Sequence, residues 1–417
     1  MKAKVVVVGG GAMGTCIAYH AAKRCDPLKE PVILIERDQL GAGASGGSSG
    51  VLYQNYGDRP MAGMARDALR IYTGFEGSTG RSIGFRRTGV LTVAGPKNPA
   101  GQRKLEKSLE MQLSIGIVVE RVEASRMLEI VPGIELAPGT IGAWEPGGGF
   151  VDPGRTIEAF ATLARDAGAV TRIGVRNPTV IVESGRIAGV QTDAGMFEAP
   201  LVVLATGSWT AEILKGVGVV DLPLEIAQVE QLFLRMPAGG GGGDAGRAHP
   251  DVDEDVQIAT DLETRFMPSP LDRLPVPHPV VFDLDSGLFA RCEPIQDRTR
   301  VGRISPEKAQ RIAHPTHAAK SVPPAKRTEM REALARRLPA YRDLAEADHR
   351  YACVAVTPDL HPVVGPIPAI AGLYVVAGFT GNDFQLAPSI GEGIAQMLLG
   401  EPVSAFDTAY LSPERFG

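Results

Sequence analysis

Three glycines near the N-terminus have the spacing that brings a protein backbone close to phosphate. Gly9, Gly11 and Gly14 follow a short apolar run, residues 5–8 after Lys4, and precede a stripe of apolar residues with helical spacing. The first glycine of such a set permits a tight turn, the second leaves room for a pyrophosphate, and the third lets helix and strand pack closely. The helix start adds unpaired N–H groups and the positive end of a dipole. The segment therefore predicts a strand, a phosphate-binding turn and a helix.

A carboxylate follows where dinucleotide recognition requires one. A second apolar run, residues 31–35, is typical of a buried strand and ends in Glu36, about 20 residues beyond the glycines. Glu36 can accept hydrogen bonds from both ribose hydroxyls of an adenosine. The full set of strand, glycines, helix, strand and acid is far more specific than the glycines alone. It predicts dinucleotide binding but does not distinguish NAD from FAD.

Residues 37–50 favour FAD. After Arg37 this segment is rich in glycine, alanine and serine, where an NAD enzyme would normally continue directly into a helix. A loop of small residues can lie flat against a bulky ligand, and Ser45, Ser48 and Ser49 add hydroxyl donors. The alternative is a flexible linker, because such runs often have that role.

Composition sets the broad class of the protein. The 417 residues are 44% hydrophobic and 22% charged, with a formal net charge of −5, which suggests about two to three domain-sized units and no nucleic-acid partner. The four cysteines form no Cys-x-x-Cys pair and no zinc-like cluster, so free thiols in a reducing compartment and no metal are expected. Apolar runs stay well below about 20 residues, so we expect a cytoplasmic protein without a membrane span.

Motifs further along the chain resemble those of the FAD-dependent D-amino-acid-oxidase-like superfamily, which includes glycine oxidase, sarcosine oxidases and amino-acid dehydrogenases. The motifs are Phe150-Val-Asp-Pro-Gly-Arg155, Leu201-Val-Val-Leu-Ala-Thr-Gly-Ser-Trp209, Thr357-Pro-Asp359 with His361-Pro-Val-Val-Gly-Pro366, and Gly372-Leu-Tyr-Val-Val-Ala-Gly-Phe-Thr-Gly381 with the segment 382–391. The matches cover roughly residues 4–56, 140–210 and 350–400. They are specific for the superfamily and do not select one member.

The resemblance implies an α/β fold with a discontinuous Rossmann-type FAD-binding domain and an α+β substrate domain whose mixed sheet roofs the flavin. The FAD-binding domain would comprise residues 1–85, 141–214 and 346–417. The substrate domain would comprise residues 86–140 and 215–345, with a Gly/Pro-rich insertion at about 237–279. The insertion is interpreted as a mobile segment, with a lid or a partner contact as the alternative.

Secondary structure is expected at several places in these segments. Strands are predicted at 89–95, 279–283, 287–292 and 298–303, and helices at 102–113, 326–338 and 388–399. The helix 326–338 is charged and is expected to present a solvated outer face. In the superfamily the last helix directs its N-terminus at the flavin pyrimidine, so a second helix start is expected near Pro388.

The residues expected to bind FAD combine the N-terminal motif with the positions that the resemblance implies. They are Gly9, Gly11, Ala12, Met13, Gly14, Glu36, Arg37, Ser45, Ser48, Ser49, Val175, Thr206, Gly207, Trp209, Gly378, Gly381, Asn382, Phe384 and Gln385. Covalent attachment is not expected. The flavin-linking cysteine of sarcosine oxidases matches Ala352, and Cys353 is one position away, on the opposite face of a strand.

The resemblance implies that a small amine or amino acid, of secondary or D-amino-acid type, is oxidised to an imine by hydride transfer to flavin N5. Candidate catalytic residues are Tyr53, Arg291, Arg300, Asn382 and Gln385. Oxygen or another carrier would reoxidise the flavin. Tyr53 could instead be a core aromatic residue.

The residues that hold a substrate carboxylate in sarcosine oxidases are missing. The clamping arginine matches a position near Tyr53, and the clamping lysine matches Gln385. Arg291 is the best substitute, with Arg86 or Arg87 next, although Arg291 could equally form a structural ion pair. Arg300 roughly matches a lysine thought to assist the oxygen reaction, with a solvated strand arginine as the alternative. Because the clamp is missing, a 2-hydroxy-acid dehydrogenase and a non-catalytic FAD-binding subunit of a larger complex stay open.

Overall fold

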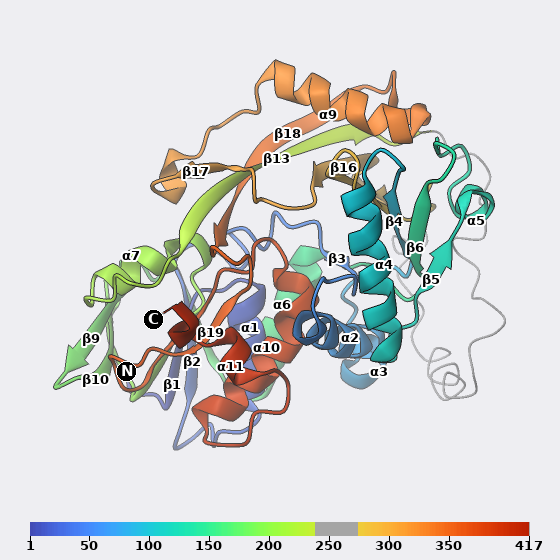
Figure 1. The fold of residues 1–417 in the computed structure, drawn as a ribbon. Helices are drawn as coiled ribbons and strands as arrows, with labels where there is room; N and C mark the ends of the chain where they lie inside the picture. Colours follow the sequence, from blue (N-terminus) through green and yellow to red (C-terminus); the bar gives the residue numbers. More distant parts are fainter. Residues whose placement is uncertain (238–273, 417) are drawn as a thin grey trace.

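The computed structural model describes residues 1–237 and 274–416, and two large sheets dominate these residues (Figure 1). The six-stranded sheet has the order β19-β20-β12-β1-β2-β8. From β20 to β8 its strands run parallel, and β19 pairs antiparallel to β20. The strands are β19 (Val363–Pro366), β20 (Leu373–Ala377), β12 (Leu201–Leu204), β1 (Val5–Val8), β2 (Val32–Glu36) and β8 (Val170–Ile173).

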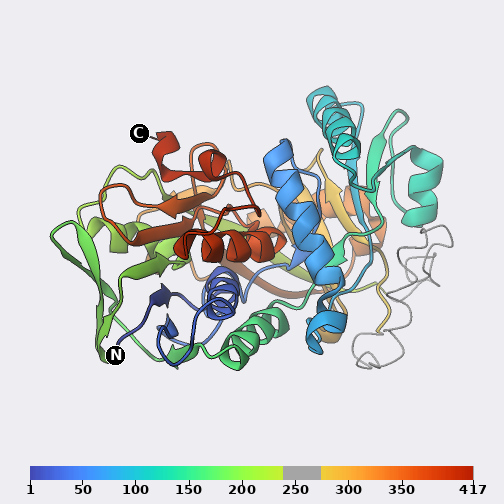
Figure 2. The same ribbon diagram turned by 90° about the horizontal axis from the view of Figure 1, so that it is seen from below.

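Strand β1 lies inside the six-stranded sheet because its four valines are apolar on both faces. Val6 pairs with Ile33 on one side and with Val202 on the other, and each of the four valines is at most 3% exposed. One face packs on α1 (Ala12–Ala22), α6 (Pro153–Asp166) and α10 (Asp383–Leu398), which lie together in Figure 2. The other face packs on the three-stranded sheet of β9 (Thr179–Glu183), β10 (Arg186–Thr192) and β11 (Gly195–Glu198), beside α7 (Thr210–Lys215).

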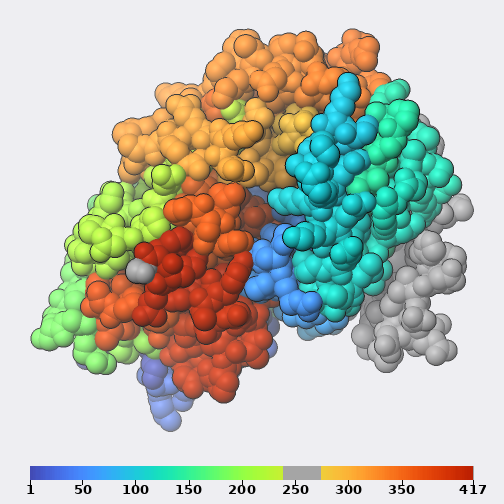
Figure 3. All heavy atoms as spheres, in the orientation of Figure 1, coloured from blue at the N-terminus to red at the C-terminus, as the bar shows by residue number. Residues whose placement is uncertain are grey.

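The nine-stranded sheet occupies the upper and right-hand part of the molecule in the view of Figure 1. In the same view, Figure 3 shows that orange segments of the chain cover the top of the molecule. Its strands are β17 (Gln310–Ile312), β13 (Glu225–Arg235), β16 (Arg298–Arg303), β15 (Leu288–Glu293), β14 (Val280–Asp283), β4 (Val90–Ala94), β6 (Ile141–Glu145), β5 (Glu120–Val122) and β18 (Glu346–Val356). Its outer face packs on α9 (Pro324–Arg337) and α5 (Ala124–Ile130). Further elements are β3 (Val51–Leu52), β7 (Gly149–Phe150), α2 (Arg59–Thr73), α3 (Phe75–Thr79), α4 (Pro99–Ser114) and α11 (Thr408–Leu411).

The strands and helices expected within residues 89–113, 279–303 and 326–338 are confirmed as β4, α4, β14, β15, β16 and α9. On α9 the last turn departs from a purely solvated helix, because Arg337 is buried and donates hydrogen bonds to Asp283 and Asp285. In these described ranges, no helix is long and apolar enough to cross a membrane.

The two sheets divide the chain differently from the predicted domain boundaries. Strands β6 and β18 fall in segments assigned to the FAD-binding domain, yet β6 pairs with β4 and β18 pairs with β13 in the nine-stranded sheet. The division into an FAD-binding and a substrate domain stays a prediction. Most of the predicted insertion, residues 238–273, lies outside the described residues.

The last long helix begins earlier than predicted. Helix α10 starts at Asp383, so Pro388 lies inside it and not at its N-terminus. Proline has no N–H to donate to the carbonyl four residues before it, which here belongs to Phe384. The buried hydroxyl of Tyr72, on α2, donates a hydrogen bond to that carbonyl at 2.8 Å. This tertiary contact supplies the missing donor, so the helix extends back to Asp383.

Replacing Gly14 by alanine should separate α1 from β1. A Cβ atom at Gly14 would lie 1.8 Å from the carbonyl oxygen of Gly9, so the helix would have to move. We expect Gly14→Ala to lower the free energy of unfolding by about 1–3 kcal/mol and to weaken FAD binding, measured by urea denaturation and flavin titration.

The matched control is Gly63→Ala on α2, where a Cβ would meet nothing within 4 Å. This control should be neutral or stabilising by up to about 1 kcal/mol. Wild-type stability and flavin affinity in Gly14→Ala would contradict the packing role of Gly14.

Candidate functional site

A cavity of about 720 Å³ lies between the two sheets. It begins at the carboxyl ends of β1, β2, β12 and β20, where Gly9, Glu36, Ala205 and Gly378 form part of its wall. It extends to aromatic residues of the nine-stranded sheet, among them Phe282. Parallel α/β sheets bind their ligands at this edge, because the strand ends and helix starts converge there.

Two helix starts face this cavity without a side-chain cap. Gly11 precedes α1, Asn382 precedes α10, and neither helix has a side-chain hydrogen bond at its cap. Ser45 connects the two starts, since its Oγ accepts from the Ala12 N–H at 3.2 Å and donates to Asp383 Oδ2 at 2.9 Å. Helix starts attract anions, so this part of the cavity fits the pyrophosphate of a dinucleotide.

The carboxylate of Glu36 is held in place at the end of β2. Its oxygens accept hydrogen bonds from the N–H groups of Gly10 at 2.7 Å and Asp38 at 2.9 Å. Nearby, the guanidinium of Arg37 lies 4.5 Å from the ring centroid of Trp209, and both residues line the cavity. A fixed acceptor beside a flat cationic and aromatic wall fits an adenosine.

Most of the residues predicted to bind FAD line the cavity. They are Gly9, Gly11, Met13, Glu36, Arg37, Ser45, Ser48, Ser49, Val175, Thr206, Gly207, Trp209, Gly378, Gly381, Asn382 and Gln385. Three others do not: Ala12 presents only its N–H to Ser45, Gly14 packs on β1, and Phe384 is buried in the core. The predicted ligand role of Phe384 therefore lacks support, because its side chain points into the hydrophobic core beneath α10.

The substrate end of the cavity is aromatic. Tyr53 stacks on Tyr56 with ring centroids 5.2 Å apart and lies 5.0 Å from the ring of Phe282, which in turn lies 5.7 Å from Phe289. Tyr53 Oη donates a hydrogen bond to Asn382 Oδ1 at 2.9 Å. Tyr53, Phe282, Phe289 and Asn382 all line the cavity, so Tyr53 is both an aromatic neighbour and part of the site.

Gln385 lies in the same wall with an unsatisfied amide. Its side chain is buried, and within the described ranges Oε1 makes no hydrogen bond. Leaving a buried polar atom unpaired costs about 1–3 kcal/mol, and native structures rarely do so without a reason. A polar group bound in the cavity would satisfy this amide, which fits the presence of a cofactor or substrate.

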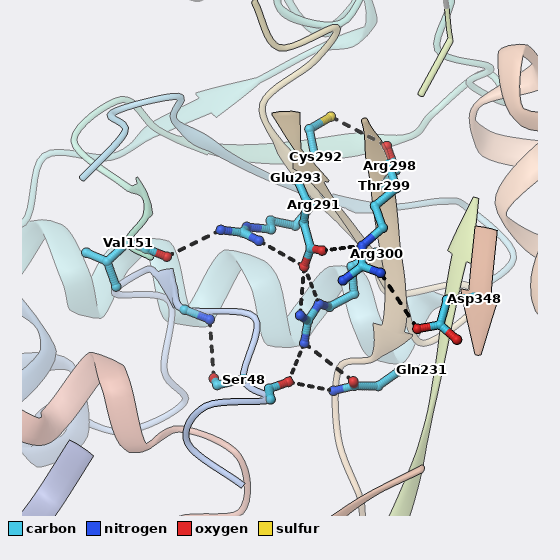
Figure 4. Close-up of polar contacts among 12 residues, drawn as sticks. Ser48, Val151, Gln231, Arg291, Cys292, Glu293, Arg298, Thr299, Arg300 and Asp348 are labelled. Atoms are coloured by element: carbon cyan, nitrogen blue, oxygen red, sulfur yellow. Dashed lines mark hydrogen bonds and ion pairs between the residues drawn. The ribbon is translucent and has the colours of Figure 1, made fainter. Parts of the chain in front are cut away.

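The catalytic roles of Arg291 and Arg300 stay predictions, and the contacts of both side chains favour a structural role. Neither lines the cavity, and both are bound to the buried Glu293, together with Arg298 (Figure 4). Arg291 also donates to the carbonyl of Val151 and lies 4.0 Å from the Phe150 ring centroid. Because a buried carboxylate requires paired cations, both guanidinium groups are bound to Glu293 and do not face the cavity.

Arg300 has a second task, at the Gly/Ser loop of residues 37–50. It donates a hydrogen bond to the carbonyl of Gly47, and Gln231 Nε2 lies 3.4 Å from the same oxygen. In Figure 4, the guanidinium of Arg300 lies below Glu293, and Gln231 lies below Arg300. The other arginines suggested to bind a substrate carboxylate do not line the cavity either. Arg86 donates a hydrogen bond to the carbonyl of Leu274, and Arg87 is exposed.

Ala352 and Cys353 lie on opposite faces of β18, as the one-residue shift requires. Ala352 lines the cavity, whereas Cys353 Sγ lies 3.8 Å from the carbonyl oxygen of Pro315. All four cysteines are free thiols. Non-covalent FAD stays a prediction, and this geometry supports it at the position where sarcosine oxidases attach their flavin.

One residue of the site escaped prediction from the sequence. Asp383, the first residue of α10, lines the cavity and accepts from Ser45. Desolvation raises the pKa of its carboxyl, with the hydrogen bond from Ser45 opposing this shift. An acidic residue directly after Asn382 could have indicated a site residue in the sequence. Its position in the cavity wall becomes evident only from the contact with Ser45.

The chain belongs to the FAD dependent oxidoreductase (DAO) family, which matches residues 4–397. Its fold is the one expected for that family. It is 29% identical over 424 residues to 4-methylaminobutanoate oxidase (formaldehyde-forming) of Paenarthrobacter nicotinovorans, covering 99% of this chain and 45% of that protein. It is 24% identical to peroxisomal sarcosine oxidase of Mus musculus, covering 99% of this chain and 95% of that protein.

Among solved structures, L-proline dehydrogenase from P. horikoshii is similar in fold, with a TM-score of 0.81 and 22% identity over 100% of this chain and 98% of that one. Glycine oxidase from Geobacillus kaustophilus gives a TM-score of 0.76 and 22% identity over 99% of this chain and 98% of that one. The chain spans 45% of the oxidase from Paenarthrobacter and a similar share of the mammalian dimethylglycine dehydrogenases that it also matches.

Removing the charge of Glu293 should destabilise the fold. Burial opposes ionisation, but the charges of Arg300 and Arg291 lower the pKa of Glu293 to about 2. A depressed pKa stabilises the fold above the ordinary glutamate pKa, and this contribution is lost as the pH falls toward 2. We expect Glu293→Gln to lower the free energy of unfolding by about 3–5 kcal/mol at pH 7, measured by urea denaturation.

The difference in the free energy of unfolding between wild type and Glu293→Gln should shrink below about pH 4.5, close to the pKa of a glutamate in the unfolded chain. Glu183→Gln, at an exposed position on β9, is the control and should change stability by less than about 0.5 kcal/mol. Equal stability of Glu293→Gln and wild type at pH 7 would show that the ion-pair cluster is not needed.

Acid precipitation of the purified holoprotein should leave the flavin in the supernatant. Ala352 offers no sulfur to the cavity, and the Cys353 thiol points away from it. Flavin absorbance of supernatant and pellet is the measurement, and Cys353→Ala should behave as wild type does. Yellow flavin retained in the pellet would overturn non-covalent binding.

Proposed function

We propose that this protein oxidises a small amine or amino acid, of secondary or D-amino-acid type, to an imine. The observation that carries the proposal is the arrangement of Tyr53, Asn382 and Gln385 at the start of α10, beside an aromatic wall in the cavity. Bound FAD supplies the acceptor for the two electrons and the hydrogen of the C–H bond. The amide and hydroxyl groups of the three residues can hold an amine nitrogen by hydrogen bonds.

The aromatic wall favours the reactive form of an amine. Tyr53, Phe282 and Phe289 exclude water from one side of the site, and a site of low dielectric disfavours a charged ammonium. The neutral amine, which has a free electron pair on nitrogen, is the form that can be oxidised at the neighbouring carbon. The aromatic rings also position the carbon chain by packing.

The nature of the relatives supports the same proposal. Those named above are called an oxidase of 4-methylaminobutanoate, an oxidase of sarcosine, a dehydrogenase of L-proline and an oxidase of glycine. Each of these compounds carries an amine, and several carry it as a secondary amine. We extend this class of substrate to the present chain as part of the proposal.

The carboxylate of such a substrate would be held differently from the family pattern. Arg303 contributes to the cavity wall near Phe289, but its guanidinium pairs with Glu230 at 3.1 Å and Glu329 at 3.6 Å. We therefore propose that polar groups at the start of α10, not a dedicated arginine, orient the substrate. Oxygen or another carrier would reoxidise the flavin, and we place the protein in the cytoplasm without a nucleic-acid partner, consistent with its net charge of −5.

Anaerobic bleaching of the bound flavin tests the proposal directly. Sarcosine, 4-methylaminobutanoate, L-proline, glycine and D-amino acids should be mixed with oxygen-free holoprotein, with matched 2-hydroxy acids as controls. We expect bleaching by one or more amines and none by the hydroxy acids. Peroxide formation on admitting air would identify oxygen as the acceptor.

Bleaching only by 2-hydroxy acids would replace the proposal with a hydroxy-acid dehydrogenase. The absence of bleaching by every compound, together with co-purification of a partner, would indicate a non-catalytic FAD-binding subunit. A relative named as the regulatory subunit of mouse pyruvate dehydrogenase phosphatase, 25% identical over 236 residues, gives this third outcome a specific basis.

A further inference from the structure

Aromatic and aliphatic side chains form an apolar subsite at one end of the cavity. Tyr53, Phe289 and Ile304 are partly buried and pack around the buried side chains of Val51 and Phe282. All five residues line the cavity, and we call them the apolar subsite. Their partly buried members leave apolar surface facing the cavity. Contiguous apolar surface in a concave site is typical of a place where a ligand binds.

The three rings of the apolar subsite are in contact with one another through Phe282. Its ring centroid lies 5.0 Å from that of Tyr53 and 5.7 Å from that of Phe289, with interplanar angles of 54° and 44°. Tilted pairs at these distances are favourable, so the rings hold each other in place. The hydroxyl of Tyr53 donates to Asn382 Oδ1 at 2.9 Å. The rings therefore connect the polar start of α10 with Phe289.

A glycine on the neighbouring strand makes room for the ring of Phe289. Gly302 on β16 is the cross-strand partner of Phe289 on β15. A Cβ atom at Gly302 would lie 2.6 Å from Cε1 and 2.8 Å from Cζ of the Phe289 ring, so the ring lies over this glycine. Any side chain at position 302 would push the ring away from the sheet and toward the cavity. The glycine thus keeps the cavity wide in front of Phe289.

The apolar subsite faces the dinucleotide-binding residues across the cavity. Gly11, Glu36 and Asn382 belong to the half that is built on the six-stranded sheet, whereas Phe282 and Phe289 are on strands of the nine-stranded sheet. A dinucleotide held by the first half leaves the space against the second sheet to another ligand. In an enzyme that uses FAD as its electron acceptor, this other ligand is the substrate.

The charged side chains next to the apolar subsite are bound to acids. At the end of β16, the guanidinium of Arg303 lies 3.1 Å from the carboxylate of Glu230 and 3.6 Å from that of Glu329. On β15, Arg291 lies 3.0 Å from the buried carboxylate of Glu293. Neither guanidinium is directed at the rings. The apolar subsite therefore suits an apolar group of a ligand better than a charged one.

We infer that the apolar subsite binds a bulky apolar group of the substrate and that Phe289 sets the size of this group, an inference that rests on the proposed amine oxidation. The polar start of α10 holds the amine nitrogen, and the three rings hold a branched or aromatic hydrocarbon group attached to the same molecule. Glycine and sarcosine carry no such group. The preferred substrate is thus a larger member of the proposed class, and Phe289 is a specificity-determining residue.

Reduction of the flavin by matched series of amines tests this inference. One series is sarcosine, N-methylleucine and N-methylphenylalanine, and the other is N-methylethylamine, N-methylisopentylamine and N-methyl-2-phenylethylamine. The rate of reduction over the dissociation constant is measured by stopped flow in oxygen-free holoprotein. In a series that reduces the flavin, we expect this ratio to rise by at least about tenfold from the smallest to the bulkiest compound, because each buried methylene adds to binding.

A constant or falling ratio in a reactive series would overturn the inference and leave amine oxidation standing. Failure of every compound in both series, and of the amines in the wider panel above, to reduce the flavin would overturn both proposals. The two failures are therefore distinguishable in one set of measurements.

Two variants change the subsite in opposite directions. Phe289→Ala removes the ring, and the preference for the bulkiest over the smallest compound should fall by about tenfold, with little change for the smallest. Gly302→Ala pushes the same ring toward the cavity, so it should weaken binding of the bulkiest compound most, and it decides the question if Phe289→Ala does not fold. Phe416→Ala, at a partly buried position outside the cavity wall, should keep the wild-type preference.

A measurement that is independent of activity separates a substrate contact from a cofactor contact. Release of FAD from diluted holoprotein is followed by the rise in flavin fluorescence. Phe289→Ala should release FAD at the wild-type rate, because its ring faces the substrate. Faster release from Phe289→Ala with an unchanged substrate preference would assign the ring to the flavin and overturn the inference. An equal loss of binding for small and bulky compounds in both variants would overturn it as well.

Discussion

The close contact of α1 with β1 at Gly14, a residue without a side chain, is the constraint on which the site depends. Gly14 lies so close to the carbonyl of Gly9 that any larger residue would separate the helix from the strand. This contact sets the first helix start at the sheet edge, and α10 packs beside α1 with its own start facing the same cavity. The two helix dipoles therefore act on one ligand, which is the physical basis for binding a dinucleotide here.

The nine-stranded sheet closes the site through a buried network of charges. Glu293 neutralises part of the charge of three arginines, and one of them, Arg300, also binds the carbonyl of Gly47. The same sheet contributes Phe282 and Phe289 to the cavity. Its inner face thus has two regions, a polar one that holds the Gly/Ser loop and an apolar one that faces the substrate.

Local patterns predicted much of this structure, and long-range contacts account for what they missed. The glycine spacing, the apolar runs and Glu36 act over short distances, so they predicted the dinucleotide unit and most of its ligand-facing residues. Arg291 and Arg300 could not be assigned in this way, because their role depends on Glu293 and on the loop carbonyl opposite. The start of α10 depends on the hydroxyl of Tyr72, which lies far away in sequence.

The Gly/Ser loop of residues 37–50 contacts both halves of the molecule. Ser45 joins it to the two helix starts beside the six-stranded sheet, and Gly47 joins it to Arg300, Gln231 and Arg350 on the nine-stranded sheet. A ligand that orders this loop consequently strengthens the docking of one sheet on the other. By thermodynamic reciprocity, a more stable contact between the two sheets increases the affinity for the ligand. Cofactor affinity and the stability of the contact between the sheets are therefore coupled.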